Sequence, residues 1–475
     1  MHAASRDPRP EPVTRLLARA LATATIDALP GPVSEAAQRS VLDWLGSALA
    51  GASEPPARMC HSVVAGLGTS DEATVFGAGR SSAAGAALAN GVASHILEFD
   101  DVHKGSTLHA GAPVISAALA VAEREHADGR AFLLAVALGY EAALRIGEAV
   151  NPSHYRFWHP TGTVATFGAA VAAGSLLKLD AAQLLDALGS AGTQAAGLWE
   201  FNADGAMSKH LHPGKAAFNG ILAADLARVG FTGASRILEG ERGFFLAMST
   251  SYDTSRITDG LGSHWKITEN CYKLHSCCGH THTAIDVALA LRAQRHWSGA
   301  EAAQQVTAIH VESYGPGVEI VREPNPRTPY QAKFSLAYCV AAALLEGKVG
   351  LDQFAPDRFA GDGVRDAHID RLLQRTRVSV DPALTARYPS AWPARVTIKL
   401  EDGNVLSDSA EYPRGNPENP VSTAALAVKF SALVESRLGR EVARRALAAA
   451  RSVESCPDMA TLFRDFGHSA PSAVA

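Results

Sequence analysis

Residues 161–177 read TGTVATFGAAVAAGSLL, a helix-length segment in which alanine is the commonest residue. Alanine has the highest helix propensity, and small side chains let neighbouring helices approach closely. Segments of similar composition recur at about residues 81–97, 113–125, 130–149, 181–196, 215–229 and 281–293. The sequence therefore predicts a mainly α fold with a large all-helical domain.

The residue pattern changes from helical periodicity to strand-like alternation between about residues 300 and 405. Alternating β-branched runs occur there at Val306–Ser313 (VTAIHVES), Arg377–Val380 and Ala394–Leu400 (ARVTIKL), as expected for strands. Helical periodicity returns through Ser422–Ala450, after a stretch rich in proline and glycine. We expect a discontinuous helical domain (residues 13–270 and 410–475), an inserted smaller α+β domain (271–409) and a disordered arm (1–12).

Composition excludes several classes of protein. The 475 residues are 47% hydrophobic and carry a net charge of -5, without the basic excess that nucleic acids require. The six cysteines are too few and too scattered for a secreted disulfide framework. No signal peptide and no uninterrupted apolar run of about 18 residues is visible. We therefore expect a soluble cytoplasmic protein with no nucleic-acid or membrane partner.

Polar clusters rich in histidine precede several of the predicted helices. They are His95, Glu98, Asp100, Asp101, His103 and His109; His154–Thr163 (HYRFWHPTGT); Ser208–Lys215 (SKHLHPGK); and Cys271–Thr283 (CYKLHSCCGHTHT). A helix N-terminus offers free N–H groups and a positive dipole end to an anion. Lysines in these clusters add charge, Arg156 could bind a carboxylate in bidentate fashion, and histidines can transfer protons near neutral pH. Together the clusters predict a site for a small polyanion, whereas each one alone could simply cap a helix.

Metal and nucleotide sites are less well supported. The cluster at residues 271–283 offers zinc-ligand types, but its adjacent cysteines fit structural zinc poorly. Asp100 and Asp101 are neighbours in the chain, so their side chains point in different directions. The sequence has no Walker motif, dinucleotide fingerprint or nucleophile elbow. We therefore expect no metal and no cofactor.

At these clusters the sequence resembles the MmgE/PrpD family, whose members include 2-methylcitrate dehydratase, cis-aconitate decarboxylase and iminodisuccinate epimerase. The similar segments are Ser40–Gly51, His95–Val114, His159–Ala173, Lys209–Asn219, Lys273–Asp286, Ala332–Ala343, Gly347 and Pro413–Lys429. The resemblance implies a helical domain made from both ends of the chain, an inserted α+β domain and a homodimer. It also implies an active site in the cleft between the domains, without a cofactor.

The resemblance extends to individual residues. Asp101 matches the second acid of the family's Asp-Asp pair, and His109 matches the histidine a few residues beyond it. His159 matches the histidine of a His-Pro-Thr-Gly turn, Lys209 the lysine before the third helix, and Lys273 the lysine that opens a Lys-x-aromatic-Pro-Cys-Cys segment. We expect these five residues to be catalytic. We expect substrate contacts from Glu98, His103, Arg156, Thr161, His275, Cys278 and His282.

Several positions depart from the family pattern. Glu98 replaces an aspartate, Val102 a threonine and Cys278 the histidine of the decarboxylase. His275 replaces an aromatic residue, and Ser276 replaces a proline. These changes argue against identity with cis-aconitate decarboxylase and weaken the match to 2-methylcitrate dehydratase.

The leading hypothesis is a lyase that removes water from a small hydroxylated di- or tricarboxylate, such as a citrate derivative, after abstraction of an α-proton. The alternatives are an epimerase that exchanges an α-proton, a decarboxylase of an aconitate-like acid, and a non-catalytic carboxylate-binding protein. Every catalytic version requires His109, His159, Lys209 and Lys273 to meet at one cleft, within about 10 Å of one another, whereas the binding protein would need the lysines but not the paired histidines. Cations crowded there should lower the pKa values of these lysines and histidines.

Overall fold

The computed structural model describes residues 11–68, 70–361 and 363–468. The chain is mainly helical with a small mixed α/β region, as the sequence predicts. The expected arm at residues 1–12 lies outside the described residues except for Glu11 and Pro12. Among the described helices, none combines the length and apolarity that crossing a membrane requires.

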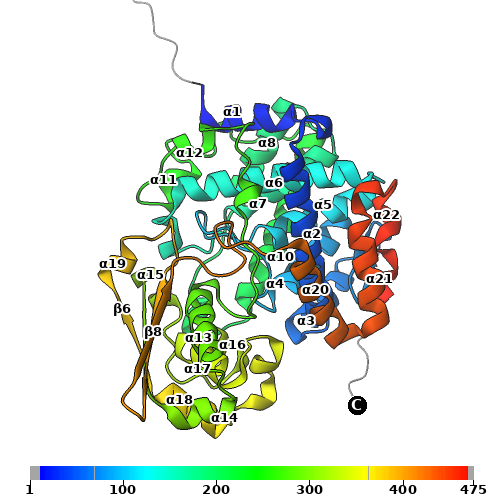
Figure 1. Cartoon of the computed structure of the whole chain (residues 1–475). Coiled ribbons are helices and arrows are strands. Elements are labelled where there is room, and N and C mark those ends of the chain that lie inside the picture. Colours follow the sequence, from blue (N-terminus) through cyan, green and yellow to red (C-terminus); the bar gives the residue numbers. More distant parts are fainter. Residues whose placement is uncertain (1–10, 69, 362, 469–475) are drawn as a thin grey trace, which may run out of the picture.

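Helices from both ends of the chain form the larger part of the molecule (Figure 1). From the first part of the chain these are α1 (Val13–Ala22), α2 (Gly31–Gly51), α3 (Pro55–Gly66), α4 (Ala83–His95), α5 (Gly111–Arg124), α6 (Gly129–Val150), α7 (Ala165–Leu176), α8 (Ala181–Gly192), α9 (Phe201–Asp204), α10 (Ser208–Arg228), α11 (Phe244–Met248) and α12 (Ser255–Thr258). The C-terminal segment adds α20 (Thr423–Leu438), α21 (Arg440–Arg451) and α22 (Met459–Leu462), and α20 packs along α2.

Glycine pairs allow the central helices to touch. A Cβ atom on Gly91 of α4 would lie 2.7 Å from the Cα atom of Gly214 in α10. A Cβ atom on Gly139 of α6 would lie 2.8 Å from the carbonyl oxygen of Gly168 in α7. No larger residue fits at such crossings, so these glycines set how closely the helices pack.

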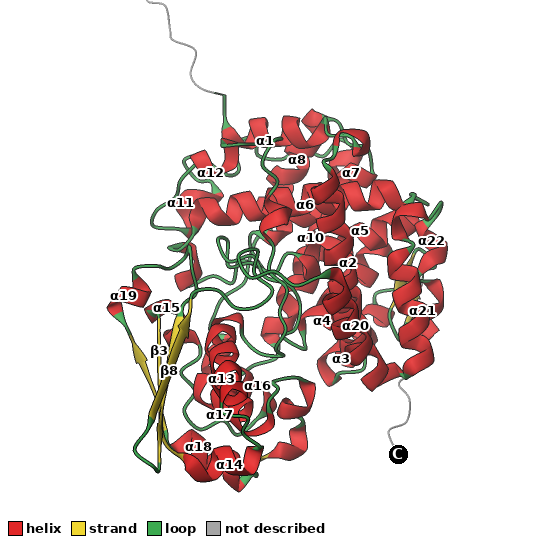
Figure 2. Cartoon of the chain, in the orientation of Figure 1, coloured by secondary structure: helices red, strands yellow, loops and turns green. Residues whose placement is uncertain are grey.

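The smaller region is built on a mixed sheet with strand order β6-β3-β7-β8 (Figure 2). Its strands are β3 (Val306–Ser313), β6 (Thr376–Val380), β7 (Ala394–Leu400) and β8 (Val405–Ala410), and only β3 and β6 pair in parallel within this sheet. Its helices are α13 (His282–Gln294), α14 (Gly299–Gln305), α15 (Gly315–Ile320), α16 (Pro329–Lys333), α17 (Leu336–Glu346), α18 (Ala367–Gln374) and α19 (Pro382–Thr385). The short pairs β1–β2 (Ala73–Val75, Gly79–Ser81) and β4–β5 (Phe359–Ala360, Gly363–Val364) lie outside the sheet.

Buried apolar side chains fall into two large clusters. One contains residues from Leu17 to Tyr272 and from Val421 to Phe466. The other contains residues from Cys277 to Leu400, including those on the inner face of β3 and β7. On this basis we propose the division into a discontinuous helical domain (residues 13–270 and 410–475, described to 468) and an inserted domain (271–409).

Lys429 links the C-terminal helix α20 to the N-terminal part of the chain. Its ammonium lies 2.6 Å from Asp43 Oδ1 on α2 and donates to the Phe99 carbonyl at 2.6 Å, and both charged side chains are buried. Replacing one member of a buried ion pair leaves the other without its partner.

We expect Lys429→Met to lower the free energy of unfolding by about 3 kcal/mol, measured by denaturant titration. The double variant D43N/K429M should recover part of this loss, because no buried carboxylate remains. Lys348→Met, which removes an exposed lysine paired with Asp352, should change the free energy by less than about 1 kcal/mol. Wild-type stability in K429M would show that the pair does not anchor α20.

Candidate active site

The turn formed by residues 97–99, just beyond α4, lies at the centre of the site. Glu98 has a φ of +56°, a left-handed conformation that is uncommon outside glycine. Lysines from three other segments bind consecutive carbonyls of this turn. Lys333 donates to Leu97 (2.8 Å), Lys273 to Glu98 (2.8 Å) and Lys429 to Phe99 (2.6 Å). The unusual conformation of the turn is thus held by groups from both domains.

The carboxylate of Glu98 joins two of the predicted catalytic lysines. Lys209 Nζ bonds to Oε1, and Lys273 Nζ lies 3.6 Å from Oε2. The Glu98 side chain is buried. Burial opposes its ionisation, but the two ammonium groups outweigh this effect and hold the pKa of Glu98 well below its ordinary value.

His109 presents an unprotonated nitrogen to the site. Its Nδ1 lies 2.6 Å from the Asp101 carbonyl oxygen, which can only accept a hydrogen bond, so Nδ1 carries the proton of the neutral ring. Among the described residues nothing bonds to its Nε2. Burial lowers the pKa of His109 to about 3, so the ring is neutral at pH 7. Its backbone N–H donates to Thr161 Oγ1 (3.2 Å), the role the structure gives to that predicted site residue.

Behind His109 lies a buried ion pair. His95 Nδ1 is 2.8 Å from Asp100 Oδ2, which is also 3.5 Å from His109 Nδ1. The carboxyl is buried, but His95 and His109 outweigh the effect of burial and lower the pKa of Asp100. The His95 ring stacks on that of His159 with centroids 5.8 Å apart. His95 and Asp100 belong to the first histidine cluster, yet the sequence offered no reason to rank them above its other members.

His159 lies on the turn between the 3₁₀ helix η2 (His154–Arg156) and α7. Its backbone N–H donates to the Gly197 carbonyl (2.9 Å), and its Nδ1 lies 3.0 Å from Nδ1 of His212. Burial lowers the pKa of His159 well below its ordinary value. The centroid of its ring is 6.4 Å from that of His109.

Helix α10 begins at Ser208, seven residues earlier than the prediction of residue 215. The sequence pattern predicts that the whole segment at residues 208–215, which includes Pro213, lies ahead of the helix. Instead the helix continues through Pro213, and the next residue, Gly214, packs against α4. Lys209 and His212 therefore lie in the first turns of α10, facing the turn at residues 97–99 and His159 respectively.

These side chains surround a cavity of about 20 Å³, the size of one water molecule. Its lining comes from both domains: Glu98, Val102, Thr107, His109, Tyr155, His159, Trp199 and Lys209 on one side, and Cys278, Gly279, His280, Phe334 and Trp392 on the other. The structure thus brings His109, His159 and Lys209 to one cavity. Lys273 contacts the far side of Glu98 and does not line it.

A much larger cleft, about 1040 Å³, adjoins the cavity. It lies between residues 152–205 of the helical domain and residues 316–388 of the inserted domain. Tyr155, Trp199 and Phe334 line both spaces, so they form the partition between them. The predicted site residue Arg156 is found in this cleft, with its guanidinium 5.0 Å from the centroid of the Phe157 ring, rather than in the cavity.

Other predicted site residues lie behind the cavity wall. Asp101 accepts hydrogen bonds from Tyr140 Oη (2.6 Å), Asn270 Nδ2 (2.6 Å) and the Gly111 N–H (3.1 Å), so it fixes the start of α5. Burial raises its pKa to about 7. His275 pairs with Asp286 (3.0 Å), and His282 packs against His275. Cys278 does line the cavity, and burial raises the pKa of its thiol to about 11.

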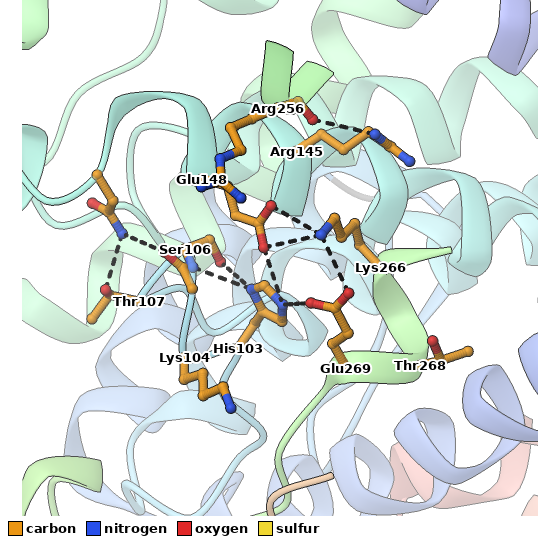
Figure 3. A network of polar contacts seen from close by, with 12 residues as sticks. His103, Lys104, Ser106, Thr107, Arg145, Glu148, Arg256, Lys266, Thr268 and Glu269 are labelled. Atoms are coloured by element: carbon orange, nitrogen blue, oxygen red, sulfur yellow. Dashed lines mark hydrogen bonds and ion pairs between the residues drawn. The ribbon is translucent and has the colours of Figure 1, made fainter. Parts of the chain in front are cut away.

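His103 points into a separate polar network (Figure 3). Its Nδ1 bonds to Ser106 Oγ (2.9 Å), and its Nε2 lies 3.4 Å from Glu269 and 3.8 Å from Glu148. Carboxylate and imidazole atoms here are close enough to hold a metal ion, as are those of His95, Asp100 and His109. In the His103 network, however, Lys266 Nζ lies 3.0 Å from Glu148 and 3.2 Å from Glu269, so an ammonium already supplies the positive charge.

The sequence did not identify the aromatic part of the wall. Tyr155 and His280 lie within two of the histidine clusters but were not ranked, and Trp199, Phe334 and Trp392 lie outside all four. A single aromatic residue in a loop carries no periodic signal. For such a residue, the sequence evidence was limited to its closeness in the chain to a histidine cluster.

Neutral buried histidines make this fold sensitive to acid. Burial lowers the pKa values of His109, His210, His212 and His280 to about 3 and that of His154 to about 4. An unfolded chain would protonate these rings below about pH 6.5, so stability is lost as the pH falls through that value. Asp101 and Glu123, with pKa values raised to about 7, act in the opposite direction but are fewer.

We therefore expect the melting temperature to fall between pH 7 and pH 5, measured by differential scanning calorimetry. His210→Phe removes one such ring outside the cavity wall and should make the dependence shallower. A melting temperature that rises on acidification would contradict the assignment of neutral histidines.

Comparisons with known proteins cover most of the chain. Residues 15–257 match the model of the MmgE/PrpD N-terminal domain, and residues 275–455 match that of the MmgE/PrpD C-terminal domain. A cis-aconitate decarboxylase-like protein, oryM, of Aspergillus oryzae is 27% identical over 91% of this chain and 93% of its own length. The cis-aconitate decarboxylase of Aspergillus terreus is 27% identical (86% of each chain), and that of Homo sapiens is 27% identical (95% and 93%).

Proposed function

Because the chain belongs to the MmgE/PrpD family, we propose that it is a cofactor-independent lyase acting on a small di- or tricarboxylate, with decarboxylation of an aconitate-like acid as its reaction. One observation carries the proposal: an ammonium group, Lys209, and two imidazoles, His109 and His159, whose Nε2 atoms have no bonding partner among the described residues, line one buried cavity. The relatives named as cis-aconitate decarboxylases support decarboxylation over the other reactions of the family.

Dehydration, the leading hypothesis from the sequence, is the second candidate. Loss of water needs one base for the α-proton and one acid for the hydroxyl. Two cavity histidines with ring centroids 6.4 Å apart could divide these tasks. None of the relatives named above is a dehydratase, so dehydration ranks below decarboxylation.

Substrate would enter from the large cleft and would separate the two domains slightly. A water-sized cavity cannot hold a tricarboxylate, whereas the adjoining cleft can. Phe334 and Trp392 of the inserted domain form part of the cavity wall. Their movement away from Tyr155 and Trp199 would open the partition, and closure over the substrate would then exclude water.

Lysine charge would stabilise the reaction intermediate. In decarboxylation the bond between a carbon and its carboxylate breaks, CO₂ leaves, and the electron pair is delocalised into a neighbouring conjugated carboxylate. The ammonium of Lys209 faces the cavity and would stabilise that added charge. Lys273, held by the Glu98 carbonyl, would keep the carboxylate of Glu98 in place as the partner of Lys209. A histidine would finally protonate the carbon.

Neutral histidines cannot supply that proton until the substrate changes their environment. His109 and His159 both have lowered pKa values in the substrate-free protein. A polyanion bound beside them favours the imidazolium form and raises these pKa values. Binding should therefore draw one proton from solution into the site.

We expect binding of a small tricarboxylate near pH 7 to be coupled to net proton uptake. Isothermal titration calorimetry in two buffers with different ionisation enthalpies measures this quantity directly. His109→Gln and His159→Gln, tested separately, should each reduce the uptake. Binding without any uptake would rule out a histidine as the group charged by the substrate.

The reaction itself is tested by incubating the protein with a panel of carboxylates in deuterated water and following the mixture by NMR. Decarboxylation appears as CO₂ and a deuterated product, dehydration as a new alkene, and epimerisation as α-deuteration without loss of a group. We expect decarboxylation, and activity should survive prolonged chelation. Dehydration alone would favour the second candidate.

Variants provide the control for this assay. His109→Gln and His159→Gln should each lower kcat by about 100-fold or more, whereas His296→Asn, at an exposed position far from the cavity wall, should not change it. Carboxylate binding with no turnover of any panel member would instead support a non-catalytic binding protein.

A further inference from the structure

His212 is bonded to a cavity histidine but does not itself line the cavity. Two glycines leave room for this side chain beside His159. A Cβ atom on Gly162 would lie 3.1 Å from His212 Cβ, and one on Gly197 would lie 3.4 Å from His212 Nδ1. Phe201 packs edge-on against the same ring at 5.4 Å. The 3.0 Å contact between the two Nδ1 atoms is therefore built into the fold.

A hydrogen bond between two facing Nδ1 atoms links the states of the two rings. Burial lowers the pKa values of both His159 and His212, so both rings are neutral at pH 7. Only one of the facing nitrogens can then carry the shared hydrogen. If His159 Nδ1 carries it, His159 Nε2 is a base and His212 Nε2 holds a proton; if His212 Nδ1 carries it, the two outer nitrogens exchange these states.

The outer nitrogen of His212 has a route to solvent. The residue is 9% exposed, and within the described part of the chain no group bonds to Nε2. His159 Nε2 is likewise free of protein partners among the described residues and belongs to a side chain that lines the cavity. The pair thus extends from the cavity to the edge of the protein.

The other cavity histidine has no such connection. His109 Nδ1 bonds to the Asp101 carbonyl, which cannot pass a proton onward. Asp100 lies 3.5 Å from the same nitrogen and leads to His95, which is fully buried with an unpartnered Nε2. The two histidines of the cavity therefore differ in their access to solvent protons.

We propose that the His159–His212 pair relays protons between the cavity and solvent, and that His212 is a positioning residue acting through His159; the inference rests on the proposed lyase function. Water gives a proton to His212 Nε2, the hydrogen on His212 Nδ1 passes to His159 Nδ1, and the proton on His159 Nε2 passes to the substrate carbon. The bound polyanion stabilises the extra positive charge while the proton moves through the pair, and both rings are neutral again once the carbon is protonated. This supplies the solvent proton that the decarboxylation consumes, and it leaves the hydrogen on His159 Nδ1 and no proton on His159 Nε2. When the cavity opens to release the product, water protonates His159 Nε2, the hydrogen returns from His159 Nδ1 to His212 Nδ1, and His212 Nε2 gives its proton to solvent, so both rings regain their starting states.

The variant His212→Asn distinguishes a role of His212 in proton transfer from a role in holding the His159 ring in place. An asparagine amide can still bond to His159 Nδ1, but it cannot pass a proton through to solvent. We expect kcat to fall by about 10- to 100-fold, with KM and the melting temperature near their wild-type values. The control His210→Asn removes another buried imidazole from the same helix and should keep kcat within a few-fold. Wild-type kcat in H212N would overturn the relay.

His212→Ala adds a rescue test. Free imidazole can occupy the vacated space beside His159, and kcat should rise with imidazole concentration in H212A but not in wild type. If imidazole does not restore kcat and the melting temperature is also lower, His212 has a structural role and the proposal is overturned.

NMR of the substrate-free protein with ¹⁵N-labelled histidine tests the pair independently of any reaction. We expect one protonated and one unprotonated Nδ1, coupled through their shared hydrogen, with the coupling lost in H212N. Two unprotonated Nδ1 atoms would overturn the relay whatever the activity. If the signal is present but no carboxylate is turned over, only the proposed function fails, because the relay is judged by the coupling alone.

Discussion

Three consecutive backbone carbonyls, each bound by a lysine from a different part of the chain, hold the site together. Lys333 comes from the inserted domain, Lys273 from the loop that enters it, and Lys429 from the C-terminal helix. A charged donor bound to a buried carbonyl makes a stronger hydrogen bond than a neutral donor. Glu98 adopts its left-handed conformation within this arrangement. The turn at residues 97–99 is thus where the two domains and the two ends of the chain meet.

Burying several ammonium groups in one region requires internal anions. Glu98 balances Lys209 and Lys273, and Asp43 balances Lys429. Near His109, Asp100 supplies the negative charge, paired with His95. The histidines respond differently, because desolvation is the largest cause of their lowered pKa values and the nearby cations add to it. The sequence suggested crowding of cations as the cause; in the structure, burial dominates. Charge in this site is held in lysine–carboxylate pairs, while burial keeps the imidazoles of His109 and His159 neutral.

The mainly α architecture was predictable because it follows from composition and periodicity, which are local properties. Strand β8 was missed because VLSDSA faces solvent along most of its length and so lacks an apolar alternation. The start of α10 was misplaced because the polar segment SKHLHPGK lacks the alanine-rich pattern of the other helices, and the packing of Gly214 on α4 is not visible from one segment. In the site, a candidate such as His109 was found by its cluster. His109 lines the cavity, whereas Asp101 lies behind its wall. This difference depends on the direction of each side chain, which no sequence pattern reveals.

Three of the five positions at which this chain departs from the family pattern, Glu98, Val102 and Cys278, line the cavity. Val102 and Cys278 both line it, and neither offers the strong hydrogen-bond donor that threonine or histidine would supply. The raised thiol pKa keeps Cys278 uncharged. Orientation of a polycarboxylate would then depend more on Lys209 and on neighbouring groups such as His280, whose Nδ1 and Nε2 are bonded to Tyr314 and Tyr155. An unsaturated acid places fewer hydroxyl groups against this wall than a hydroxylated one. The less polar wall therefore disfavours a hydroxy acid as substrate, and with Cys278 in place of the decarboxylase histidine the polar contacts to an unsaturated acid would have to come from Lys209, His109 and His159.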